Sequence, residues 1–296
     1  MLARASFTPL TTGAAKAVSI TGNQTRNMAT LKEIQGRLKS VTNISKITKS
    51  MKMIASTKTT RAQRAMNVAR IYGITSNEFI KQAGITTPEN ATELVVVSSS
   101  DKGLCGGIHS SVSRFTRSYL KENADTELVV IGDKAKAQLQ RLFPSNIKLN
   151  FNQIGSFTPT YEESTSIANA ILNNPDIKYD ISKIVYNKFV SAIAYEADTM
   201  VCPNSVEQIN AGSNINAYEA DAEILENLKE FLFGNQVFWA LVEGHAAEMA
   251  AKRTAMENAT KNAEEMIQKL TLTYNRGRQA QITNELIDII TGASAL

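Results

Sequence analysis

The chain has 296 residues, 43% of them hydrophobic, which is enough to bury the core of one large domain or two small ones. Lys and Arg outnumber Asp and Glu by 32 to 28, and no apolar run approaches the roughly 20 residues that a membrane-spanning helix needs. Two cysteines make no disulfide framework, and two histidines, His109 and His245, lie far apart without flanking ligands. We therefore expect no metal site and no cofactor.

Residues 1–29 differ in composition from the rest of the chain. They include Arg4, Lys16 and Arg26, many Ser and Thr, and no acid. This composition is typical of an organellar transit peptide, although a disordered N-terminus is the alternative interpretation. We expect removal near residues 28–30 and exclude the segment from the fold.

A very long helix is expected over about residues 30–82. From Arg37 to Tyr72 there is no Gly and no Pro, although the helix could end at Gly73 instead. Its apolar positions recur at intervals of three and four residues, near the period of a coiled coil, so we expect this face to pack on a partner helix. These positions are Leu31, Ile34, Leu38, Val41, Ile44, Ile47, Met51 and Ile54, continued by Ala62, Ala65, Val68 and Ile71.

A second long helix is expected over about residues 216–291. Small and flexible side chains recur every seven residues at Met249, Met256, Ala263 and Leu270, and a second set lies three places later. The second set is Ala259, Met266 and Thr273. The two helices start and end on the same side of the central region, so the simplest arrangement pairs them antiparallel as a stalk.

The central region alternates short apolar runs with helical stretches, which predicts a small α/β domain with a mainly parallel sheet. The expected strands are Glu93–Ser99, Glu127–Gly132, Lys183–Val190 and Tyr195–Cys202, and the expected helices cover about 107–121, 133–142 and 161–173. Four residues separate the last two strands, which indicates a hairpin. Asp133 is a plausible N-cap for the second of these helices.

Charge is distributed unevenly along the chain. Residues 34–77 hold nine Lys or Arg and no acid, whereas residues 78–238 hold 13 basic and 20 acidic residues. An acid-free basic helix favours an acidic partner. Nucleic acid and an anionic membrane are alternatives, but no aromatic residue interleaves the basic segment before Tyr72 and no nucleic-acid-reading motif occurs.

The segment from Val95 to Ser111 has the order strand, glycine-rich loop, helix, which often cradles phosphate. However, Gly103, Gly106 and Gly107 fit neither the P-loop nor the dinucleotide pattern. We therefore expect a tight strand-to-helix turn and no nucleotide binding, with a reactive thiol at Cys105 as an alternative. A nucleotide-dependent enzyme is disfavoured for the same reason.

Three segments together resemble the gamma subunits of F-type ATP synthases. They are Leu31–Ser56, Ser98–Ser111 and Asn275–Leu296, the last with the pattern I-T-x-E-x-x-D-x-x-x-G-A. The resemblance covers everything after residue 28. It implies a long antiparallel two-helix coiled coil bracketing a small Rossmann-like α/β domain, with no active site of its own.

The resemblance also implies a role as the central rotor shaft. The expected partners are the alpha and beta subunits of the catalytic head, the delta and epsilon subunits, and the c-ring of the membrane sector. Met51, Lys52 and Arg253 correspond to the zone near an acidic loop of the catalytic subunits, and Arg278 and Gln279 match a pair that hydrogen-bonds another such loop. The uncharged tail after Asp288 resembles a segment that turns in an apolar bearing.

The expected organisation follows. Residues 1–29 form the transit peptide, 30–84 the N-terminal coiled-coil helix, 85–205 the central α/β domain and 206–296 the C-terminal coiled-coil helix. The implied location is the matrix side of the mitochondrial inner membrane, as a peripheral protein.

Overall fold

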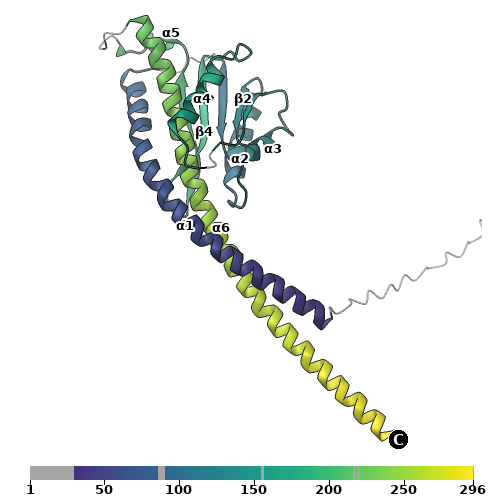
Figure 1. Cartoon of the computed structure of the whole chain (residues 1–296). Coiled ribbons are helices and arrows are strands. Elements are labelled where there is room, and N and C mark those ends of the chain that lie inside the picture. The colour runs from purple at the N-terminus through teal and green to yellow at the C-terminus, as the bar shows by residue number, and fades with distance from the viewer. Residues whose placement is uncertain (1–29, 86–90, 155–156, 216–217, 219–220, 296) are drawn as a thin grey trace, which may run out of the picture.

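The computed structural model describes residues 30–85, 91–154, 157–215, 218 and 221–295, so the expected transit peptide lies outside the described residues. Two long helices, α1 (Leu31–Gln82) and α6 (Ala222–Ser294), wind around one another in opposite directions (Figure 1). A globular domain packs against the N-terminal half of α6, and the C-terminal half of α6 extends beyond it. The antiparallel stalk expected from the sequence is confirmed.

The helix α1 starts at a capping box, in which the Thr30 hydroxyl accepts from the Glu33 N–H and the Glu33 carboxylate accepts from the Thr30 N–H. It then runs through Gly73 without ending there. The indole of Trp239 lies directly on Gly73, so packing against α6 offsets the poor helix propensity of glycine at this position.

A five-stranded sheet of order β3-β2-β1-β4-β5 forms the centre of the globular domain. The first four strands are parallel, and β5 pairs antiparallel to β4 in the expected hairpin. The strands are β1 (Glu93–Ser98), β2 (Glu127–Ile131), β3 (Ile147–Phe151), β4 (Ile181–Phe189) and β5 (Tyr195–Pro203). The strand β3 was not predicted, because Lys148 and Asn150 interrupt its apolar character at an edge of the sheet.

Helices cover both faces of the sheet. On one face, α2 (Ile108–Glu122) and α3 (Asp133–Leu139) pack on alternate residues of β1 and β2, including Val95 and Val97. On the other face, α4 (Tyr161–Leu172) and α6 pack on the intervening residues. A short helix, α5 (Val206–Asn210), precedes α6. The stalk helix α6 is therefore part of the core of the globular domain.

The prediction that Asp133 is an N-cap was wrong. The cap residue of α3 is Gly132, and Asp133 is the first helical residue, whose N–H donates to Asp101 Oδ1 at 2.6 Å. A Cβ on Gly132 would lie 2.6 Å from the backbone nitrogen of Ser100, and φ is +100°. The backbone after β2 approaches the backbone after β1 so closely that only glycine fits, and Asp101 in the loop that follows β1 supplies the acceptor.

The predicted seam of α1 was correct at its start and again at Ala62 and Ala65, which pack in a buried cluster with α6, and wrong at several positions between and after them. Ile44, Ile47 and Ile54 point outward, with 51%, 58% and 56% of their surface exposed, and Val68 and Ile71 are also exposed. Apart from Met66, the buried or half-buried residues of this part of α1 that the prediction missed are small or polar: Ser45, Thr48, Ala55, Thr59, Ala69 and Gly73. Small side chains let the two helices approach closely, which large isoleucines would prevent.

The heptad set of α6 was half correct. Met249, Met256 and Ala263 are buried as predicted. The second set lies one residue later than predicted, at Thr260, Ile267 and Tyr274 in place of Ala259, Met266 and Thr273. Thr260 is buried in the seam, where its hydroxyl donates to Thr48 Oγ1 at 2.9 Å.

A candidate docking surface on the paired helices

The outer surface of α1 carries both exposed charge and exposed apolar side chains. Of its nine basic residues between positions 34 and 77, Lys52 and Arg70 form ion pairs with α6. The others occupy exposed positions: Arg37, Lys39, Lys46, Lys49, Lys58, Arg61 and Arg64. With Ile44, Ile47 and Ile54 beside them, this surface can bury apolar area and also pair with carboxylates of another chain.

Three of the candidate contact residues lie close together at mid-stalk. Lys52 Nζ lies 3.1 Å from Glu257 Oε1 across the helix pair, and Met51 is half-buried next to it. The hydrogen bond from Lys52 lowers the pKa of Glu257, and the charges of Lys52, Lys261 and Arg253 add to this. Lys52 is thus already engaged within the chain, which the sequence could not reveal.

The other two candidates lie in a separate place. The stalk stops being two-stranded where Leu31 meets Gly277, since Leu31 Cδ2 lies 3.0 Å from a Cβ built on that glycine. Arg278 and Gln279 follow immediately and are exposed. At 1.5 Å per residue they lie roughly 37 Å along α6 from Arg253. The sequence-based set therefore divides into a mid-stalk group and a tail group.

The tail of α6 beyond Gly277 is a single exposed helix that reaches Ser294. Its exposed apolar side chains are Ile282, Leu286, Ile287, Ile289 and Ile290. An isolated helix with this much apolar surface needs a partner to shield it from water. The structure therefore supports a second docking surface at the end of the stalk.

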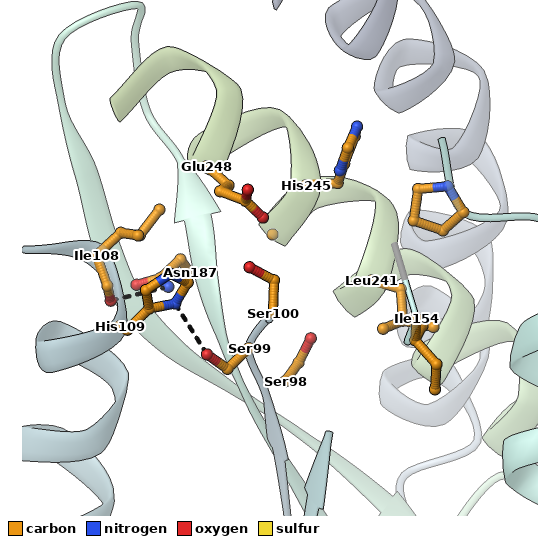
Figure 2. A pocket seen from close by; sticks show the side chains of 12 residues that line it. Ser98, Ser99, Ser100, Ile108, His109, Ile154, Asn187, Leu241, His245 and Glu248 are labelled. Carbon is orange, nitrogen blue, oxygen red and sulfur yellow. Dashed lines mark hydrogen bonds between the residues drawn. The ribbon is translucent and has the colours of Figure 1, made fainter. Parts of the chain in front are cut away.

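The glycine-rich loop lies at the carboxyl ends of β1 and β4, where doubly wound sheets usually bind ligands. Here α6 fills that crevice with Leu241, His245 and Glu248 (Figure 2). The cavity that remains has a volume of about 20 Å³, enough for one water molecule and far below the roughly 300 Å³ of a small-ligand pocket. The glycine-rich loop therefore forms a packing surface for the stalk helix α6.

Hydrogen bonds fix the glycine-rich loop in its position against α6. His109 lies 2.9 Å from Ser99 Oγ through Nδ1 and 2.9 Å from the carbonyl of Lys102 through Nε2. The Cys105 thiol donates to the carbonyl of Gly103 and reaches Glu248 Oε1 at 3.5 Å. The loop is therefore fastened both to the sheet and to α6.

Burial shifts the pKa values of two titratable groups around this crevice, Cys105 and His245. Burial raises the pKa of the Cys105 thiol to about 12, and the neighbouring Glu248 adds to the rise. Burial lowers the pKa of His245 to about 4, with Lys102 and Lys58 contributing. A neutral histidine and a protonated thiol are structural groups at neutral pH, so the reactive-thiol alternative for Cys105 is not supported.

Within the described part of the chain, His, Cys, Asp and Glu form no group of three or more that could hold a metal ion. The same residues include no helix long and apolar enough to cross a bilayer.

Comparison with known proteins identifies the family. The sequence pattern described as ATP synthase matches residues 30–296. The chain is 47% identical over 277 residues to the mitochondrial ATP synthase subunit gamma of Yarrowia lipolytica, covering 92% of this chain and 94% of that protein. It is 41% identical over 274 residues to the corresponding subunit of Rattus norvegicus, covering 90% of this chain and all of the relative.

Solved structures agree with this assignment. A chain in the central stalk and c-ring structure of Tetrahymena thermophila mitochondrial ATP synthase aligns with a TM-score of 0.59 at 28% identity, covering 72% of this chain and 99% of that one. A chain of the Euglena gracilis enzyme, at 19% identity, shares the fold with a TM-score of 0.75 and covers 90% of this chain and 94% of its own. The chain belongs to the family of ATP synthase gamma subunits.

Proposed function

We propose that this chain is the central rotor shaft of the proton-translocating ATP synthase, and that it couples proton-driven rotation of the membrane ring to ATP synthesis at the beta-subunit sites. The observation that carries the proposal is the two-stranded stalk that projects from a globular base and ends in a single exposed apolar helix. The chain acts as a non-catalytic subunit, since α6 fills the crevice where a nucleotide would bind.

The partners follow from the same architecture. The stalk sits among the alternating alpha and beta subunits, and the globular base stands with the delta and epsilon subunits on the c-ring. The location is the matrix side of the mitochondrial inner membrane. The chain divides into a transit peptide (1–29), the N-terminal helix (30–84), the α/β domain (85–205) and the C-terminal segment with its long helix (206–296).

The coupling mechanism is differential contact. The stalk carries bases and isoleucines on the outer side of α1, so the subunits around it do not all meet the same surface. A contact that is stronger in one conformation of a catalytic subunit shifts that subunit toward this conformation. Rotation presents the same contact to the next subunit, and the three sites change conformation in turn.

The proposed contact residues are the mid-stalk group Met51, Lys52 and Arg253 and the tail pair Arg278 and Gln279. Lys52 and Arg253 hold a cluster around Glu257 that an acidic loop of a catalytic subunit can join. The tail pair is exposed just beyond the last turn of α1, where backbone or carboxylate oxygens of a second loop can accept from both side chains.

The test uses the assembled enzyme with Arg278→Ala and Gln279→Ala together. Both side chains are exposed, so the isolated chain stays folded while ATP synthesis per proton falls severalfold. Glu264→Ala with Glu265→Ala, also exposed on α6, is the matched control and leaves synthesis unchanged. Wild-type synthesis in the first variant contradicts the tail contact, and failure of the tagged chain to retain beta subunits contradicts the proposed function.

A further inference from the structure

We infer that Asp101 is a positioning residue, which holds in place two loops by which the globular domain contacts α6. One is the glycine-rich loop (residues 99–107) between β1 and α2, and the other is the loop that follows β3 and includes Gln153 and Ile154. These contacts carry part of the torque from the base to the stalk, a consequence that rests on the proposed function. The positions of the loops themselves can be tested without it.

Both loops pack against α6. In the glycine-rich loop, Cys105 is buried in one cluster with Ala247 and Ala251 of α6. In the loop after β3, Ile154 packs on the core that contains Leu241 of α6, and both residues line the cavity shown in Figure 2. The two loops therefore contact successive parts of the same stalk helix.

The carboxylate of Asp101 connects the two loops. Asp101 lies in the glycine-rich loop, and its Oδ2 accepts from the Gln153 N–H, in the loop after β3, at 2.6 Å. Its Oδ1 accepts from the Asp133 N–H, also at 2.6 Å, where β2 leads into α3. Hydrogen bonds to an ionised acceptor are roughly twice as strong as those between neutral groups. The segments that follow β1, β2 and β3 are thus joined through one side chain.

The two N–H donors depend on this carboxylate. Asp133 begins α3, where the first N–H groups have no partner within the helix, and the cap residue Gly132 has no side chain to accept from them. Gln153 has a φ of +62°, in the left-handed region that non-glycine residues rarely adopt, so its hydrogen bond to Asp101 helps to offset the strain. Removing the carboxylate should therefore loosen the loop after β3 as well as the glycine-rich loop.

Two other sets of hydrogen bonds in the glycine-rich loop do not replace those of Asp101. His109 is hydrogen-bonded to the Ser99 hydroxyl and to the Lys102 carbonyl, all within the segment from β1 to α2. The Ser99 N–H donates to the Ile131 carbonyl and so continues the pairing of β1 with β2. None of these bonds reaches the loop after β3. Asp101 therefore fixes the two loops relative to one another.

The test replaces Asp101 in two ways. Asp101→Ala removes both acceptor oxygens, whereas Asp101→Asn keeps the size of the side chain but only one acceptor oxygen, so that its NH₂ group faces one of the two N–H donors. The matched control is Asp133→Ala. It removes an exposed negative charge at the same place but keeps the Asp133 N–H and both hydrogen bonds to Asp101.

The readout is the rate at which a maleimide labels each of the two native cysteines in the purified full-length chain. Cys105 lies in the glycine-rich loop and is 2% exposed, and Cys202 lies in β5, is 1% exposed and serves as the internal reference. We expect Asp101→Ala and Asp101→Asn to raise the rate at Cys105 at least tenfold, because the loop opens locally, and to change the rate at Cys202 less than twofold. Both rates should stay at the parent values in the Asp133→Ala control.

An unchanged rate at Cys105 in Asp101→Ala overturns the inference. An equal rise at Cys105 and Cys202 also overturns it, since this would mean that the variant destabilises the whole domain. A parent rate at Cys105 in Asp101→Asn overturns it as well, because the side chain would then fill space and the two hydrogen bonds would not be needed. Because labelling is measured on the isolated chain, its result stands apart from the coupling assay that tests the proposed function.

Discussion

The six-membered ring of Trp239 in α6 fills the space beside Gly73 in α1: a Cβ built on that glycine would lie 1.3 Å from Trp239 Cε3. Gly73 is buried, and helix α1 is continuous on both sides of it. The absence of a side chain is therefore what allows the stalk helices to meet at this level.

We expect Gly73→Ala to destabilise the protein by about 2 kcal/mol, although alanine normally favours a helix by about 1 kcal/mol over glycine. The methyl group must displace the indole or push the helices apart. Gly36→Ala in the same helix is the matched control, because nothing lies within 4 Å of its Cβ position, and it should stabilise. Urea unfolding measures both, and equal effects of the same sign would contradict the packing argument.

Glu243 connects the stalk with the sheet and is 1% exposed. Its carboxylate accepts from the Phe189 N–H at 3.2 Å and from the Trp239 indole N–H, and it pairs with Arg70 at 3.8 Å. Glu243→Ala leaves two part-buried donors and the Arg70 charge without their acceptor, so we expect a loss of about 3 kcal/mol in the free energy of unfolding.

The control for Glu243 is Glu257→Ala, which removes an exposed pair with Lys52. It should change the free energy of unfolding far less than Glu243→Ala does, because exposed ion pairs contribute little to stability. If the two variants prove equally stable in urea, the carboxylate of Glu243 does not tie the globular domain to the stalk.

The sequence predicted the two long helices, the hairpin and most of the sheet because period and composition are local signals. It could not predict the rotation of α1, because Ile44, Ile47 and Ile54 satisfy the helical period as well as the true seam does. The true seam brings together residues that are far apart in the chain, such as Thr48 and Thr260, which are 212 positions apart. A search for apolar periodicity does not detect polar residues that are buried in the seam.

The candidate site was predictable only in part. The basic content of α1 and the exposed tail are readable from composition, but the pairing of Lys52 with Glu257 depends on the helix register. The contact of Glu248 with Cys105 in the glycine-rich loop could not be predicted either, since the two residues lie 143 positions apart in the chain. A loop that resembles a phosphate site can thus be filled by a helix from the other end of the chain.

Both cysteines should be unreactive in the folded chain. Burial raises the pKa of Cys105 and of Cys202 to about 12, against an unfolded value near 9. At pH 8 labelling should require unfolding, and urea should accelerate it at both positions. Because the thiolates form first in the unfolded chain, the stabilising contribution is complete below about pH 9 and is lost as the pH rises toward 12.

The measurement for the thiols is the labelling rate between pH 7 and 9, with Glu248→Gln as a comparison. Removing the charge of Glu248 lowers the pKa of Cys105 and speeds its labelling, while Cys202, which does not contact Glu248, keeps its rate. Fast labelling of Cys105 in the unmodified chain at pH 7 would restore the reactive-thiol interpretation.

The basic surface of α1 should contribute to assembly mainly through charge. Lys46 and Lys49 are exposed, and we expect Lys46→Gln with Lys49→Gln to weaken binding of the catalytic subunits severalfold at low salt and much less at 0.5 M salt, because salt screens exposed charges. The control is Lys134→Gln. Lys134 is exposed on α3, on the face of the sheet opposite α6, so removing its single charge should leave binding unaltered. Titration of the chain onto immobilised catalytic subunits at two salt concentrations measures the difference. Equal losses at both concentrations would mean that shape, contributed by the neighbouring isoleucines, dominates the contact.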